Sequence, residues 1–158
     1  MNRITVLLAA TVLCTPPLGA QSIENPTRLA GNARVQVRAE AVWDEMITMS
    51  AGGGTQDQFR GALAQTFEGT LAEAEAAPRL VPGAPTTVAC HVDTFYETGV
   101  ILYALRVQLE RPGDDGEPIV TWIKSWVGSY SVQQMHLMFM LGEQCANAFL
   151  EDWRANNE

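Results

Sequence analysis

The chain has 158 residues, of which 47% are hydrophobic and 18% are charged, and its formal net charge is −8. These values exclude a disordered chain and fit one globular domain with a sizeable core. The negative charge also argues against nucleic acid or an anionic membrane surface as a partner, because both are bound by basic surfaces.

The first twenty residues predict a secretory signal. Asn2-Arg3 supplies a positive start, residues 4–14 form a short apolar run, and a breaking segment ends at Ala20. A run of about eleven residues is too short to span a bilayer, which takes about twenty. We therefore expect cleavage after Ala20 and an exported protein, periplasmic or secreted, with no transmembrane helix in the mature chain.

The remainder is predicted to form one domain preceded by a leader. Residues 21–32 are polar and contain Pro26 and Gly31. This composition predicts a mobile leader, since proline and glycine interrupt regular structure. We assign the single domain to residues 33–158.

A strand and a helix are expected in the first part of this domain. Apolar and polar residues alternate in 33–43, which is typical of a strand with one buried face. Thr55 and Gln58 have the spacing of a capping box, which predicts a helix start at this point. An amphipathic helix then follows up to Ala77-Pro78, because apolar residues recur every three or four positions, at Phe59, Leu63, Phe67, Leu71 and Ala74.

The segment from Val88 to Glu110 predicts a β-hairpin, because both halves alternate apolar and polar residues. A two-residue turn at Glu97-Thr98 would pair Cys90 with Leu105. The apolar residues of the two strands would then share one face of the sheet.

Residues 119–130 predict a third strand that is partly apolar on both faces. If Ile119, Ile123 and Val127 face the helices, the other face carries an aromatic and basic row. Together with Arg106 of the hairpin, this row would form a binding surface, since Trp and Tyr lead at interface hot spots. The predicted binding residues are Trp122, Lys124, Trp126, Tyr130 and Arg106. The alternative is a central strand covered on both sides, in which the tryptophans are core.

The last element is predicted as a helix from Val132 to about Asn156, and its apolar stripe contains Cys145. Without the signal, Cys90 and Cys145 are the only cysteines. In an exported chain their simplest use is a disulfide, which would pin the closing helix to the hairpin. The alternative is two buried thiols that never meet.

Residues suited to catalysis are few. His91 and Asp93 share one strand face about 6.6 Å apart, and such a pair could serve acid–base chemistry or contribute to a metal site. However, no third ligand has a suitable spacing, and no hydrolase or phosphate-loop motif is present. We therefore expect no metal, no cofactor and no enzymatic activity. The alternative is a small hydrolase or metal-dependent enzyme built on His91 and Asp93.

The predicted order is strand, helix, hairpin, third strand, helix. It indicates an α+β fold in which an antiparallel sheet of three to four strands has two helices packed on one face. The sequence favours an exported, non-enzymatic accessory or binding domain of the bacterial cell envelope, whose aromatic and basic sheet face holds a protein or amphipathic partner. A small-molecule carrier with a cavity between sheet and helices is a further alternative. The identity of the partner and the oligomeric state are left open.

Overall fold

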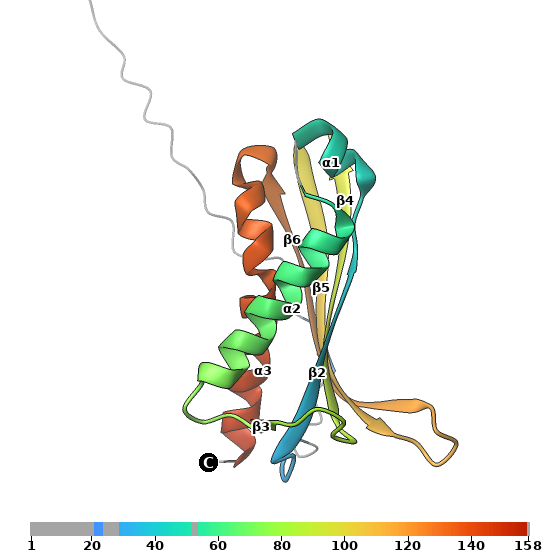
Figure 1. Ribbon diagram of the computed structural model, residues 1–158, viewed down its shortest axis with the longest axis vertical. Coiled ribbons are helices and arrows are strands. Elements are labelled where there is room, and N and C mark those ends of the chain that lie inside the picture. The colour runs from blue at the N-terminus through green and yellow to red at the C-terminus, as the bar shows by residue number, and fades with distance from the viewer. Residues whose placement is uncertain (1–20, 24–28, 52–53, 158) are drawn as a thin grey trace, which may run out of the picture.

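The computed structural model describes residues 21–23, 29–51 and 54–157, so the predicted signal, residues 1–20, lies outside the described residues. Helices α2 and α3 lie side by side on one face of a twisted sheet, and neither of them nor any other helix of the described residues covers the opposite face (Figure 1). The strand order across the sheet is β1-β6-β5-β4-β2-β3. The strands are β1 (Gln21–Ile23), β2 (Arg34–Val42), β3 (Arg79–Leu80), β4 (Thr87–Glu97), β5 (Val100–Pro112) and β6 (Pro118–Ser131). The helices are α1 (Glu45–Ala51), α2 (Gln56–Glu73), the 3₁₀ helix η2 (Val132–Met140) and α3 (Leu141–Asn157).

The α+β class is confirmed, but the prediction of an antiparallel sheet of three to four strands was wrong in detail. The sheet is mixed, because β2 runs parallel to both β4 and β3. The reason is α2, whose 18 residues cross the sheet and return the chain to the end where β2 began. The two extra strands, β1 and β3, are only 3 and 2 residues long. They are too short to show the alternation of apolar and polar residues by which a strand is predicted from sequence.

Part of the predicted leader contacts the domain. Strand β1 pairs antiparallel with β6, with Gln21 opposite Ser125 and Ile23 opposite Ile123. Leu29 is fully buried, and the Gly31 amide donates to Asn157 at the end of α3.

Helix α2 begins as predicted. The Gln58 amide donates to the Thr55 hydroxyl, and the Thr55 amide donates to Gln58 Oε1, which completes the capping box. The predicted apolar stripe is the buried one: Phe59, Leu63, Phe67 and Leu71 are at most 1% exposed.

The β4–β5 hairpin is confirmed, but its register differs by two residues from the predicted one. Glu97 pairs with Val100, so the turn residues are Thr98 and Gly99, and Cys90 lies opposite Val107. Both turn residues have positive φ, 48° and 82°, as a type I′ turn requires, and glycine accepts such a φ without strain. A shift of two keeps every side chain on its predicted face.

The disulfide between Cys90 and Cys145 is present and joins β4 to α3, with the two Cα atoms 6.0 Å apart. The predicted closing helix exists, but its first part is the 3₁₀ helix η2, and α3 begins at Leu141. Gly142 lies where α3 meets α2, because a Cβ there would collide with the Thr66 hydroxyl and the backbone at Leu63 and Phe67. The close helix contact therefore depends on the missing side chain.

Candidate functional site on the helix-free face

The predicted assignment of the two faces of β6 was wrong. Leu105 lies opposite Trp126 and Leu109 opposite Trp122, so the tryptophans share the helix-covered side with the inward residues of β5. Val127, expected to face the helices, is 52% exposed.

A β-bulge explains the exchange of faces. Near the tip of the β5–β6 hairpin, Glu110 pairs with Val120, whereas the next pair is Leu109 with Trp122. Thr121 is therefore one extra residue in β6. Its hydroxyl donates to the Leu109 carbonyl. Without this residue Leu109 would lie opposite Thr121, and every side chain from Trp122 onward would move to the other face.

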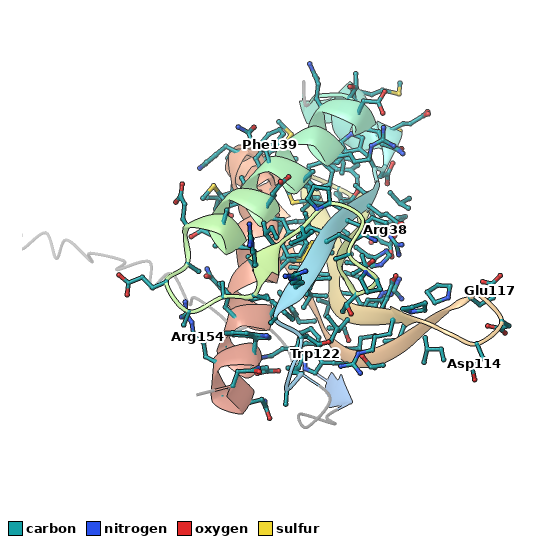
Figure 2. All side chains as sticks on the ribbon, turned by 60° about the horizontal axis from the view of Figure 1, so that its bottom comes forward. Arg38, Asp114, Glu117, Trp122, Phe139 and Arg154 are labelled. Atoms are coloured by element: carbon teal, nitrogen blue, oxygen red, sulfur yellow. A yellow bond between two sulfur atoms is a disulfide. The ribbon has the colours of Figure 1, made fainter. Side chains whose placement is uncertain are left out.

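Trp122 is a core residue. It is 2% exposed and meets Phe149 of α3 edge to face, with ring centroids 5.7 Å apart. Its indole Nε1 donates to Asp152 at 3.2 Å. Figure 2 shows Trp122 between β6 and α3, so this residue matches the alternative in which the tryptophan is buried.

Lys124 is bound to α3. Its ammonium lies 3.1 Å from Glu151 and 3.2 Å from Asp152. Burial by itself would lower the pKa of Lys124, but the hydrogen bonds to the two carboxylates outweigh it, and the pKa is raised above its ordinary value. This lysine therefore stabilises the packing of α3 on β6.

The other two aromatic residues of the row also lie on the covered side. Trp126 is partly buried against the core. Tyr130 stacks on Tyr103 with centroids 5.2 Å apart, and its hydroxyl accepts a hydrogen bond from Gln144 of α3. Burial raises the pKa of Tyr103, so this phenol stays neutral.

Arg106 is separated from the other four predicted binding residues by the sheet itself. It is exposed on the helix-free face, directly opposite His91 on β4. The structure thus brings Trp122 and Lys124 together at Asp152, and places Arg106 elsewhere.

The middle of the helix-free face carries an ionic row. Arg38 contacts Glu40 at 2.8 Å and Glu110 at 2.7 Å, and Gln108 donates to the same Glu110 oxygen. The Glu110 side chain is only 5% exposed, so its charge is balanced by Arg38 rather than by water. The charges and hydrogen-bonding groups of these residues are satisfied by one another, so their role is structural.

His91 belongs to this row. Its Nδ1 lies 3.0 Å from Glu40, and its Nε2 is buried with no hydrogen-bond partner. Burial lowers the pKa of His91, with Glu40 opposing the shift and Arg106 adding to it. A neutral imidazole whose second nitrogen is shut off from solvent is poorly placed to exchange a proton with a substrate. In the described part of the chain, no three His, Cys, Asp or Glu side chains are grouped as metal ligands would be.

The remaining feature of this face is an apolar cluster near the β4–β5 turn, here called the open-face patch. Asp93 lies opposite Val42 on one side and Ala104 on the other, and Ala104 lies opposite Val127. The next row contains Phe95 opposite Leu102. The open-face patch consists of Val42 (60% exposed), Phe95 (56%), Val100 (39%), Leu102 (41%) and Val127 (52%).

Two open hollows lie beside the patch, and Asp93 and Arg106 line both of them. The larger, about 500 Å³, also touches Ile123 and Val127. The smaller, about 350 Å³, also touches Val42. The patch is therefore bordered by two hollows that side chains of another molecule could enter.

Sequence reasoning missed these patch residues because the alternation in β4 and β5 marks which residues share a face, but not how apolar the outer face is. Phe95 and Leu102 were visible as apolar residues at polar positions of the pattern. This irregularity in the alternation was the one sequence feature that pointed to an apolar outer face.

No protein-family model matches the chain, and no curated protein does. Among solved structures, the chain is similar to a dodecamer of a PelC point variant from Paraburkholderia phytofirmans, with 16% identity, coverage of 84% of this chain and 96% of that chain, and a TM-score of 0.49. A second PelC dodecamer from the same organism gives 14% identity, the same coverages and a TM-score of 0.49. An uncharacterised protein gives 16% identity over 78% of this chain and 92% of that chain, with a TM-score of 0.40. Similarity at this level is too low to transfer a function. None of the helices in the described ranges is both long and apolar enough to cross a bilayer.

Proposed function

We propose that this protein is an exported, non-enzymatic binding domain of the bacterial cell envelope, and that it holds a protein partner on the open-face patch. The observation that supports the proposal is the patch itself: five large apolar side chains, each at least 39% exposed, on the face that is left open by the helices of the described residues. Exposed apolar side chains gathered on one face are typical of interaction sites.

The disulfide supports the exported location. Disulfides such as Cys90–Cys145 persist in oxidising compartments and are rare in the cytosol. The sequence-based expectation of a signal ending at Ala20 agrees with that location.

A protein is favoured over a lipid surface by the charges around the patch. Asp93 lies in a patch row, and Glu97 lies opposite Val100 in the last row before the turn. Since the whole chain carries a net charge of −8, an anionic membrane would be repelled.

The test compares two double variants of equal chemistry. Phe95→Ser/Leu102→Ser removes the centre of the patch, and Ile119→Ser/Val120→Ser removes two side chains of similar exposure, 52% and 43%, near the β5–β6 hairpin tip. That tip extends away from the body of the molecule (Figure 1).

We expect capture of the partner from a periplasmic extract to fall at least about tenfold for the patch variant, because truncated hot-spot residues cost about 2 kcal/mol or more. The hairpin variant should capture as the unaltered protein does. Equal capture by all three proteins would refute the proposal.

A further inference from the structure

A second surface, which shares Val127 with the patch, is the outer edge of β6. Among the residues that the structure describes, strand β1 pairs with residues 123–125 of β6. From Trp126 to Ser131, the strand that pairs with β6 within the described ranges is β5 on its other side. Half of this stretch's backbone groups therefore point away from the sheet.

The backbone groups of β6 that point away from β5 can be identified from the hydrogen bonds between these two strands. The Val132 amide donates to the Gly99 carbonyl, which fixes the phase of the β5–β6 pairing. Since alternate residues of an antiparallel strand direct both backbone groups to the same neighbour, Gly128 and Tyr130 bond to β5, and Val127 and Ser129 point outward. The next outward amide, that of Ser131, donates to Gln134 Oε1 at 3.3 Å. Within the part of the chain that the structure describes, Val127 and Ser129 thus offer two N–H and two C=O groups that no strand pairs with.

This edge lacks the features that usually keep sheet edges apart. Residues 126–131 contain no charged residue and no proline. Native proteins commonly place lysine, proline or a covering element at such a position to prevent pairing with another chain. The lack of charge and proline here indicates that pairing is tolerated or used.

We propose that a second copy of this chain pairs with β6 in antiparallel fashion about a two-fold axis through Gly128. In that register Val127 lies opposite Ser129 of the second copy, and Ser129 lies opposite its Val127. The four outward groups of each copy then find their partners in four N–H···O=C bonds, as an isologous interface requires.

The side chains suit the same register. Gly128 meets its own equivalent on the axis and adds no side chain there, while the Tyr103 ring fills the space where its Cβ would be. Trp126 lies beside Tyr130 of the second copy in a non-hydrogen-bonded pair, the type in which side chains come closest, and aromatic pairs across strands are favourable. In this register Ser131 of the second copy falls opposite Ser125, the residue that Gln21 pairs with, so the dimer requires the first residue of β1 to move aside at that one position.

The axis is perpendicular to the sheet, so the helix-free faces of both copies point the same way. Val127, a patch residue, lies next to the junction, and the two open-face patches form one larger surface. The inference does not depend on the proposed function, because it uses the strand edge rather than the patch.

The test uses the purified exported protein and its variants in sedimentation velocity over a concentration series. Ser129→Pro and Val127→Pro each remove one outward amide, and proline is tolerated at edge positions whose amide faces solvent. Ser129→Ala is the matched control, since it keeps the amide. Circular dichroism and retention of the disulfide establish that each variant is folded.

We expect the unaltered protein and Ser129→Ala to form dimers. Each proline variant removes two hydrogen bonds per dimer and should weaken association by roughly thirtyfold or more. Phe95→Ser/Leu102→Ser should still dimerise, which separates this inference from the proposed function. A monomer at every concentration, or dimers unaffected by both prolines, would overturn it. If neither proline variant folds, amide exchange in the unaltered protein decides: protection of the Val127 and Ser129 amides should rise with concentration, and fast exchange throughout would contradict the dimer.

Discussion

Replacement of Trp122 by alanine should be among the most damaging single changes in the sheet. The indole is 2% exposed, its ring meets Phe149, and its Nε1 donates to Asp152. Removing a buried tryptophan costs about 3–5 kcal/mol through lost burial and the cavity left behind. An ordinary domain is stable by about 5–15 kcal/mol, so the variant should remain folded but with much less stability.

The measurement is urea unfolding followed by far-UV circular dichroism, because the chain has 4 tryptophans and its fluorescence would change for other reasons. Phe95→Ala is the matched control: it also removes an aromatic ring, but one that is 56% exposed, and it should shift the unfolding free energy by less than about 0.5 kcal/mol. If Phe95→Ala proved the costlier change, the assignment of the two faces of the sheet would be refuted.

Three further changes test other parts of the structure. Cys90→Ala/Cys145→Ala opens a loop of 55 residues and should lower the unfolding free energy by about 4 kcal/mol in chemical denaturation, on the chain-entropy model; an unchanged midpoint would contradict a structural disulfide. Gly142→Ala gains about 1 kcal/mol of helix propensity but forces a Cβ against Thr66 and the α2 backbone, which typically costs more, so a net loss of about 1–2 kcal/mol is expected on thermal unfolding; a gain in stability would mean that the helices are farther apart. Burial lowers the pKa of His91 below 6.5, so the unfolded chain binds this proton more tightly, and the resulting stability is present above about pH 6.5 and is lost as the pH falls below it. His91→Gln should flatten that part of the stability–pH curve, and an unchanged slope would show that another group titrates there.

Local features of the fold were readable in the sequence because short-range rules decide them. The Thr55–Gln58 capping box and the α2 stripe depend on residues three or four positions apart. The disulfide could be predicted because Cys90 and Cys145 are the only cysteines outside the predicted signal. In the hairpin, alternation fixed the faces, whereas the exact register depended on the need for positive φ at Thr98 and Gly99.

The face on which the predicted aromatic row lies could not be predicted because it depends on one residue. Both faces of β6 are partly apolar, so the pattern alone could not orient it, and Thr121 as a bulge reverses the orientation. The predicted aromatic row therefore lies on the helix-covered side, with Trp122 buried and Trp126 and Tyr130 partly buried, and Arg106 is the one predicted binding residue on the helix-free face. The real exposed residues come from four strands whose neighbours are set by the parallel β2–β4 pairing, which no local pattern reveals.

The most direct test of a partner site on the open-face patch is site-specific photo-crosslinking in the periplasm. A benzoylphenylalanine placed at position 95 should give a discrete crosslink to a protein partner, while the same group at position 119, which is similarly exposed but near the hairpin tip, should not. Crosslinking from position 119 with none from position 95 would contradict the account.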